Sequence, residues 1–274
     1  KTHYWTAGSS GKNNPEARAA GVVGTFGIGA MANFGVCTEL TVESKLYGTD
    51  VTWISGVKKS ELSLNNNCIY VTASQKQRSD YGTTIVVTIS PDFILTRDKA
   101  INYLKPYVHY LSVPVYLNDE LISQDSYDVT TSTNCIDSGV LHHKDSLFEF
   151  DYRVILNNSV PVLPQCKISN IIYNHIQIKG DVCLKASEDV LFGLRNSFGL
   201  APIAVNSAFH LNGIVNLLTL VPTAGREAVS RESTSFVSKL ISITDDIVAE
   251  EIAKYPLANN SRELHAYIRN TRRY

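Results

Sequence analysis

The sequence lacks a run of about 20 apolar residues, the length that a membrane-spanning helix needs. Its first residues are polar, so we expect no signal peptide. An excess of either charge is also absent, because 25 Lys and Arg residues stand against 26 Asp and Glu residues. A near-neutral chain has no general attraction to nucleic acid or to an anionic membrane. We therefore expect a cytoplasmic protein that binds neither membranes nor nucleic acid.

Cysteine is scarce, and no two cysteines form a C-x-x-C pair; the five are Cys37, Cys68, Cys135, Cys166 and Cys183. Their odd number and irregular spacing favour free thiols in a reducing compartment over a disulfide framework or a zinc site. His142 and His143 lie near Asp145. Adjacent histidines in a strand point to opposite faces and would need a third ligand, so no metal site is expected there.

The chain is long enough for two domains, and its composition, 44% apolar and 19% charged, is that of a folded protein. In the first block, turn residues separate strand-like runs at 39–45, 51–54, 68–73 and 83–89. A short helix is predicted at 30–36. Apolar spacing predicts a second helix over 97–111, with a kink or break at Pro106. Two short strands around an Asn118-Asp119 turn follow.

The second block begins after residues 124–146, a polar and weakly patterned segment. Strands are predicted at 147–156 and 214–221, with loops at 180–181 and 212–213. An amphipathic helix capped by Ser233 or Thr234 ends before Pro256. Its acidic residues are predicted to face outward; they are Asp245, Asp246, Glu250 and Glu251. Strands followed by helices, in two blocks, predict the α+β class.

The run Gly24-Thr25-Phe26-Gly27-Ile28-Gly29 enters the first short helix. Glycines allow backbone N–H groups to approach phosphates closely, and a helix N-terminus favours an anion. By itself the run is equally typical of a tight turn. A dinucleotide-binding fold would need a strand directly before the first glycine, and a phosphate-binding P-loop would need a following G-K-[ST]. Neither feature is present.

The sequence on both sides of the glycine run favours one interpretation of it, a nucleotide-binding motif. W-T-A-G-S-S-G-K-N at residues 5–13, followed by G-T-F-G-I-G-A-M-A-N-F at 24–34, resembles the ATP lid and third glycine motif of the heat-shock protein 90 family. Residues 81–87, Y-G-T-T-I-V-V, resemble the family's G-T-x-I strand, whose threonine, here Thr83, lies near the adenine. Residues 92–117 resemble the helix and strand that follow in the family. The resemblance thus covers most of residues 4–120, in order.

A looser resemblance covers residues 214–250. L-V-P-T-A-G-R-E-A-V-S-R-E at 220–232 resembles the segment of the chaperones' middle domain that ends in V-S-R-E. The arginine of that segment reaches the γ-phosphate in the family. The resemblance assigns this role to Arg231, with Arg226 as the second choice. The alternative is that Arg231 pairs with Glu232, Glu227 or another surface carboxylate.

The resemblance implies a domain order. Residues 1–123 would be the C-terminal part of an ATP-binding domain of the GHKL class, which has the Bergerat fold, an α/β sandwich. Residues 124–146 would be a linker, and residues 147–274 a transducer or middle-type domain with C-terminal helices. The segment 121–213 departs from the chaperone pattern, which indicates a divergent bacterial or defence-associated relative rather than a housekeeping chaperone.

The resemblance also implies cofactors and a site. ATP would bind with Mg²⁺; the expected contacts are Ser10, Gly11 and Lys12 in the lid, Gly24, Phe26, Gly27, Ile28 and Gly29 in the glycine motif, and Thr83. The family's catalytic Glu, Mg²⁺-binding Asn and adenine-binding Asp precede the lid, so we expect them upstream of Lys1 and assign no metal ligand within the chain.

The function implied for the full-length protein is an ATPase that works as a chaperone-like machine, converting nucleotide state into domain rearrangement. Expected partners are a protein client and a second subunit in a homodimer. Two alternatives remain open. One is a non-catalytic scaffold derived from the Bergerat fold. The other is a DNA-handling GHKL ATPase, which the near-neutral charge and the F-G-I-G form of the glycine motif disfavour.

Overall fold

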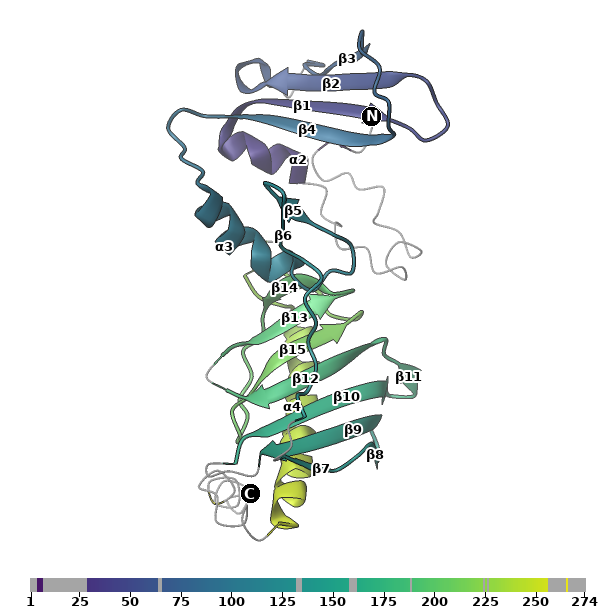
Figure 1. The fold of residues 1–274 in the computed structure, drawn as a ribbon, viewed down its shortest axis with the longest axis vertical. Helices are drawn as coiled ribbons and strands as arrows, with labels where there is room; N and C mark the ends of the chain where they lie inside the picture. Colours follow the sequence, from purple (N-terminus) through teal and green to yellow (C-terminus); the bar gives the residue numbers. More distant parts are fainter. Residues whose placement is uncertain are drawn as a thin grey trace. The chain divides into compact units, whose positions relative to one another are not determined.

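The structure is a computed structural model that describes residues 4–6, 29–63, 66–131, 135–157, 162–187, 189–223, 225, 227–255 and 265. The chain divides into two compact units, Lys1–Arg97 and Asp98–Tyr274, and Figure 1 shows the helices and strands of each. Both units combine sheet with helix, so the predicted α+β class is confirmed. In the described part of the chain, no helix is long and apolar enough to cross a membrane.

The first unit is built on a four-stranded antiparallel sheet in the order β3-β2-β1-β4. Its elements are α2 (Gly29–Ala32), the 3₁₀ helix η1 (Asn33–Gly35), β1 (Cys37–Lys45), β2 (Thr52–Lys58), the 3₁₀ helix η2 (Lys59–Glu61), β3 (Tyr70–Ala73) and β4 (Gly82–Ile89). Each strand predicted in this block is present, although β3 begins two residues later than the predicted run at 68–73.

A small core holds the helical turns of the first unit on its sheet. Phe34 from η1 packs with the strand residues Cys37, Leu40 and Val57, and all four are buried. In the sheet register Leu40 lies opposite Val57 on one neighbouring strand and Val87 on the other. The α2–η1 segment, which begins at the last glycine of the motif, is therefore fixed to the sheet by burial of apolar side chains.

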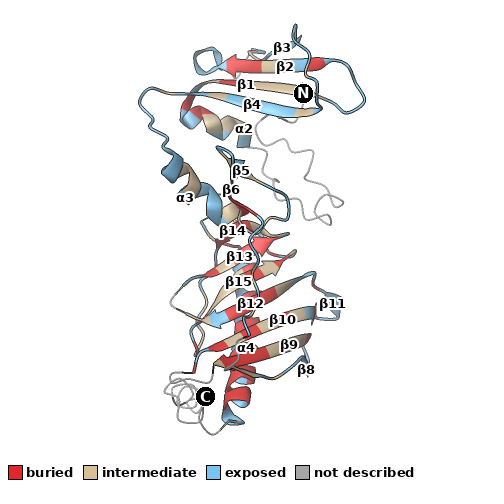
Figure 2. Cartoon of the chain, viewed as in Figure 1, coloured by how far each residue is buried: buried red, intermediate tan, exposed pale blue. Residues whose placement is uncertain are grey.

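β4 pairs only with β1 among the described strands, so it forms an edge of the sheet. Three large apolar side chains on it are exposed: Ile85, Val86 and Ile89. The exposed surface of β4 is visible in Figure 2. An edge strand with apolar side chains in water is a surface suited to contact with another segment or chain.

The second unit begins inside α3 (Arg97–Val108), after its first residue, and continues with a short hairpin of two two-residue strands, β5 (Tyr116–Leu117) and β6 (Glu120–Leu121). α3 continues two residues beyond Pro106, so the predicted helix is confirmed but does not end at the proline. The hairpin turn is also confirmed. Asn118 and Asp119 have φ values of 48° and 66°, and positive φ at both central residues is the geometry that short hairpins favour.

The large sheet of the second unit has nine strands, with a main order of β14-β13-β15-β12-β10-β9-β7. Its strands are β7 (Cys135–Asp137), β8 (Leu141–Lys144), β9 (Phe148–Asn157), β10 (Pro164–Tyr173), β11 (Ile176–Gln177), β12 (Gly180–Ala186), β13 (Leu191–Arg195), β14 (Phe198–Pro202) and β15 (Leu211–Leu217). β13 and β15 pair in parallel. β7 and β8 lie within the segment 124–146 and pair with β9, so this part of the segment belongs to the sheet.

Two loops predicted from glycine lie inside strands. Gly180 begins β12 with φ of 124°, and Gly213 lies in β15 with φ of 129°. A Cβ on Gly180 would stand 1.9 Å from the carbonyl oxygen of Asn216. Both glycines therefore permit a close approach of strand backbones instead of a loop. The predicted strand 214–221 is shifted toward the N-terminus, since β15 begins before Gly213 and ends at Leu217.

One long helix, α4 (Arg231–Ala253), crosses one face of this sheet. Its apolar stripe is buried as predicted: Val237, Leu240, Ile241, Ile247, Val248 and Ile252 are all at most 5% exposed. Phe236 packs against Phe148 and Tyr173, with ring centroids 5.5 and 5.0 Å apart. The helix begins earlier than predicted, because Ser230 is the N-cap and its hydroxyl accepts a hydrogen bond from the Ser233 N–H.

Two of the acidic residues predicted to face outward are buried instead. Asp245 is 6% exposed and Glu251 is 3% exposed. Asp245 Oδ1 accepts a hydrogen bond from Ser207 Oγ at 2.7 Å, and Oδ2 accepts one from Ala208 N at 2.9 Å. The prediction was wrong because position 245 lies four residues after Ile241 and three before Val248, on the same face of the helix.

Candidate functional site

A short hairpin leads from β15 to the start of α4. Its base, residues 221–223 and 228–230, is closed by an isolated bridge between Pro222 and Val229. Thr223 N donates to Ala228 O at 2.9 Å, and Ser230 N donates to Val221 O at 2.7 Å. The Thr223 hydroxyl also donates to Ala228 O, at 3.0 Å. These hydrogen bonds make the hairpin base a defined support for the residue that follows it, Arg231.

Arg231 is the first residue of α4 and is exposed. It forms no ion pair with any residue that the structure describes, Glu227 and Glu232 included. The neighbouring carboxylate has other partners: the pKa of Glu232 is lowered first by its own backbone N–H, then by the Ser230 hydroxyl, and also by the charge of Arg231. The Glu232 carboxylate thus interacts mainly with groups at the helix N-terminus. The guanidinium of Arg231 remains available to bind an anion.

Arg231 borders an open groove of about 560 Å³. One wall is the first two turns of α4, which contribute hydroxyl groups from Thr234, Ser235 and Ser238. The opposite wall is the loop 204–206, which precedes the segment bound by Asp245. A second cavity of about 390 Å³ adjoins the groove, shares part of this loop with it, and includes Glu227. A single cation beside several hydroxyl groups is an arrangement that suits an oxyanion such as a phosphoryl group.

Two predicted binding residues lie in the first unit. Gly29 begins α2, and among the described residues no atom outside its chain neighbours and helix backbone would lie within 4 Å of a Cβ at this position. The Asn33 side chain donates a hydrogen bond to Gly29 O at 3.2 Å. Thr83 is exposed on β4, with its hydroxyl 2.8 Å from the Ser44 hydroxyl on β1. Open space at Gly29 and an exposed hydroxyl at Thr83 are compatible with contacts to a nucleotide, which stay a prediction.

The remaining predicted contacts lie outside the described residues; they are Ser10, Gly11, Lys12, Gly24, Phe26, Gly27, Ile28 and Arg226. Gly29 and Thr83 belong to the first unit, and Arg231 belongs to the second. The structure therefore describes the local surroundings of three predicted site residues, and their assembly into one site is a proposal.

The described residues include no group of three or more His, Cys, Asp or Glu side chains that could hold a metal ion. His142 and His143 have separate partners. His142 Nδ1 lies 2.9 Å from Asp151 Oδ1, and His143 Nε2 lies 3.2 Å from Asp145 Oδ2. His142 Nε2 also lies 3.6 Å from Glu149 Oε1, and the two histidines share no carboxylate partner.

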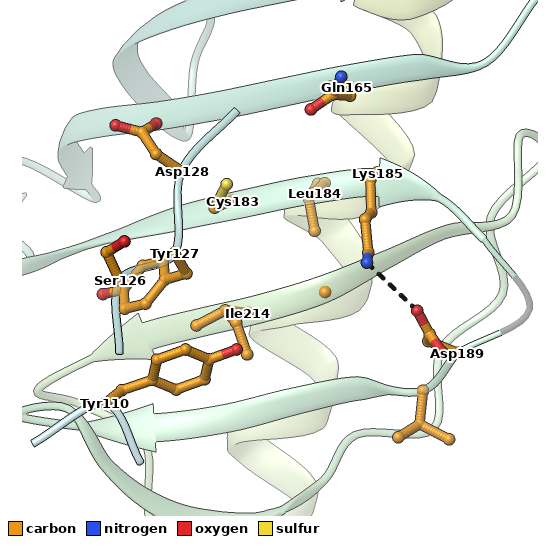
Figure 3. Close-up of a pocket in the computed structure, with 12 residues that line it drawn as sticks. Tyr110, Ser126, Tyr127, Asp128, Gln165, Cys183, Leu184, Lys185, Asp189 and Ile214 are labelled. Atoms are coloured by element: carbon orange, nitrogen blue, oxygen red, sulfur yellow. Dashed lines mark ion pairs between the residues drawn. The ribbon is translucent and has the colours of Figure 1, made fainter. Parts of the chain in front are cut away.

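A further cavity, of about 360 Å³, lies on the large sheet beside a segment that we call the strap, residues 122–131 (Figure 3). Tyr127 fixes the strap: its hydroxyl donates to Asp181 Oδ1 at 2.9 Å and accepts from Asn216 Nδ2 at 2.7 Å. Burial and the Asp181 carboxylate raise the pKa of Tyr127. At the other end of the cavity, Lys185 pairs with Asp189 at 3.4 Å. The polar sequence of the strap gave no sign of this packing.

Cys183 lines the cavity but is a poor nucleophile. Burial, followed by the negative charge of Asp128, raises the pKa of its thiol to about 11. The reactive form of cysteine is the thiolate, which is scarce at neutral pH when the pKa is this high. The cavity is therefore not a site for thiol catalysis.

Thiol labelling should follow this burial. At pH 8 iodoacetamide is expected to modify the half-buried Cys68 and Cys135 of the native protein well before the buried Cys37, Cys166 and Cys183. Mass spectrometry of tryptic peptides after timed labelling measures the order. Unfolding in guanidinium is the control, since all five thiols should then react at similar rates. Native labelling of Cys183 as fast as Cys68 would contradict the buried environment.

Comparison with known proteins adds one distant relative. The chain is 25% identical over 144 residues to the chaperone protein HtpG of Roseobacter denitrificans. The match covers 50% of this chain but only 22% of HtpG. No protein-family model matches the chain. The similarity to a chaperone agrees with the resemblance found in the motifs, at a level too distant to establish membership of a family.

Proposed function

We propose that this chain supplies the lid, the third glycine motif and the γ-phosphate-contacting arginine of an ATP-hydrolysing, chaperone-like machine. The observation that carries the proposal is Arg231: it follows a hydrogen-bonded hairpin, begins a long helix, lacks an ion-pair partner among the described residues and borders a hydroxyl-rich groove. The distant similarity to HtpG supports the same class of function.

The proposed chemistry is positioning combined with electrostatic stabilisation, as is usual for phosphoryl transfer. Backbone N–H groups of the glycine motif and the Lys12 ammonium would hold the phosphates. Arg231 would contact the γ-phosphoryl group and offset the charge that develops as the bond to the β-phosphate breaks. Its planar guanidinium suits this task because it can donate two parallel hydrogen bonds to phosphate oxygens.

The donor set within the chain fits phosphate better than a metal ion. Arginine, lysine, hydroxyl and backbone N–H groups bind phosphate oxygens, whereas Mg²⁺ requires oxygen ligands such as carboxylates. The proposal assigns no Mg²⁺ ligand, water-activating Glu or adenine-binding Asp within this chain. Mg²⁺, when bound, would neutralise phosphate charge.

Gly29 and Thr83 belong to one unit and Arg231 to the other, so the proposed hydrolysis uses residues of both units. Nucleotide state would then control domain arrangement, and that arrangement would act on a protein client or a second subunit. A non-catalytic interaction module is the second candidate. The exposed apolar side chains of Ile85, Val86 and Ile89 on an edge strand favour it.

Nucleotide binding tests the proposal directly. A non-hydrolysable ATP analogue with Mg²⁺ is titrated by calorimetry into this chain and into the full-length protein that contains it. We expect binding by the full-length protein and little or none by the chain, because the proposal assigns no adenine-binding Asp within the chain. ADP is the matched control for the contribution of the γ-phosphate. Binding by neither protein would leave the glycine run as a turn and would favour the interaction module.

A further inference from the structure

The Ser233 hydroxyl forms a hydrogen bond with a residue outside its own helix. Ser233 lies in the first turn of α4 and is 7% exposed. Its hydroxyl accepts a hydrogen bond from Val221 N at 3.1 Å, across twelve residues of sequence. It also lies 3.2 Å from the Ser230 hydroxyl, while the Ser233 N–H is the group that Ser230 caps. Ser233 thus joins the start of the hairpin base to the start of α4.

This connection completes a set of bonds around the hairpin base. Arg195 Nη1 donates to Leu220 O at 3.3 Å, directly before the base, and Val221 O accepts from Ser230 N at 2.7 Å. Leu220 and Val229 are buried at 1% and 5% exposure. The backbone at residues 220–221 is therefore hydrogen-bonded to Arg195 on one side and to the start of α4 on the other. Without the Ser233 hydroxyl, the Val221 N–H would lose the partner that the structure gives it.

The bonds of Thr234 provide a contrast. Its hydroxyl donates to Ser230 O at 3.1 Å, an ordinary contact to the preceding turn. Thr244, further along the same helix, likewise donates to Leu240 O at 2.8 Å and is fully buried. Ser233 differs from both because its hydroxyl accepts a bond from outside the helix. A hydroxyl that joins the two elements flanking Arg231 can influence the direction of the guanidinium without touching a substrate.

We infer that Ser233 is a positioning residue, whose hydrogen bond to Val221 fixes the hairpin base against the first turn of α4 and thereby directs Arg231 toward its anion. The inference rests on the proposed function of Arg231. It assigns Ser233 no contact with ATP. Loss of the bond should therefore affect the chemical step more than the binding of nucleotide.

The activity test uses the full-length protein. Ser233→Ala is expected to lower kcat for ATP hydrolysis about 3- to 10-fold, the effect of one hydrogen bond, with KM for ATP unchanged. Ser233→Thr keeps the hydroxyl and should restore much of the loss. Thr244→Val removes a buried hydroxyl from the same helix and should lower Tm while leaving kcat unchanged. On an Arg231→Ala background, Ser233→Ala should have no further effect, because the residue that it positions is absent.

Hydrogen exchange of this chain tests the positioning role of Ser233 separately from the proposed function of Arg231. The amides of Val221 and Thr223 should exchange faster in Ser233→Ala than in the unmodified chain, and Thr244→Val should not change them. Unchanged exchange in Ser233→Ala would overturn the positioning role, as would an equal loss of kcat with and without Arg231. Faster exchange together with an Arg231→Ala variant of normal turnover would show that the hairpin connection exists and that the proposed function of Arg231 is wrong.

Discussion

Replacing Arg231 with alanine is expected to lower kcat for ATP hydrolysis by about 1,000-fold in the full-length protein, the lower end of the effect of arginines that contact a transferring phosphoryl group. Binding of ATP should be nearly unchanged, because this contact strengthens mainly as charge develops on the γ-phosphoryl group. The groove beside Arg231 is open and offers no second cation among its lining residues. A coupled assay at saturating ATP measures kcat, and calorimetry with the analogue measures binding.

Two further variants make the result specific. Arg231→Lys keeps the charge but loses the planar pair of donors, so its turnover should lie between those of the unmodified protein and Arg231→Ala. Lys239→Ala removes an exposed cation from the same helix and should have normal turnover. Normal turnover in Arg231→Ala would end the assignment. Equal losses in Lys239→Ala and Arg231→Ala would attribute the effect to the general charge of α4.

Asp245→Ala is expected to destabilise the second unit by about 2 kcal/mol, the cost of leaving buried donors without an acceptor. Asp245 accepts hydrogen bonds from Ser207 Oγ and Ala208 N, and so holds the segment that follows the groove loop 204–206. Urea denaturation followed by circular dichroism measures the change in the free energy of unfolding. Glu250→Ala, at an exposed position of the same helix, should change it by less than about 0.5 kcal/mol.

The effect of Asp245 should also depend on pH. Burial raises the pKa of this carboxyl above its ordinary value, although hydrogen bonds from Ser207, Ala208 and Phe209 oppose the shift. A folded-state pKa above the unfolded one means that the folded protein holds the proton more tightly. The contribution of Asp245 to the free energy of unfolding is then complete below the pKa of the unfolded state. It declines as pH rises through the pKa of the folded state. The stability difference between the unmodified protein and Asp245→Ala should be larger at pH 4 than at pH 8, and the reverse trend would contradict the direction of the shift.

Local patterns in the sequence predicted the elements well where one periodicity dominates. The runs that became β1, β2 and β4 are strand-like segments bounded by turn residues, and the apolar stripe of α4 has regular helical spacing. The burial of Asp245 does not follow from its chemical type; it follows from its position on the helix face that carries Ile241 and Val248. The loops predicted at Gly180 and Gly213 are strand positions, and a sequence does not show which strand backbone will approach a glycine closely.

The candidate site was predictable only in part. V-S-R-E drew attention to Arg231, and the structure adds that this residue is exposed and follows a hydrogen-bonded hairpin. The sequence predicts Ser233 as a helix cap, because serine before an apolar run is typical of a helix N-terminus. Its actual partner, Val221, depends on how the hairpin returns to the helix. The strap was missed because contacts between residue 127 and residues 181 and 216 leave no local pattern.

Those strap contacts have a consequence for the order of folding. The Tyr127 hydroxyl is hydrogen-bonded to Asp181, 54 residues later in the sequence, and to Asn216, 89 residues later. Closing such long loops costs chain entropy that only a preformed sheet can offset. Asp181 and Asn216 lie opposite each other on β12 and β15, so Tyr127 gains both partners only after these strands have paired. The strap should therefore settle after the transition state, and its loss should speed unfolding more than it slows folding.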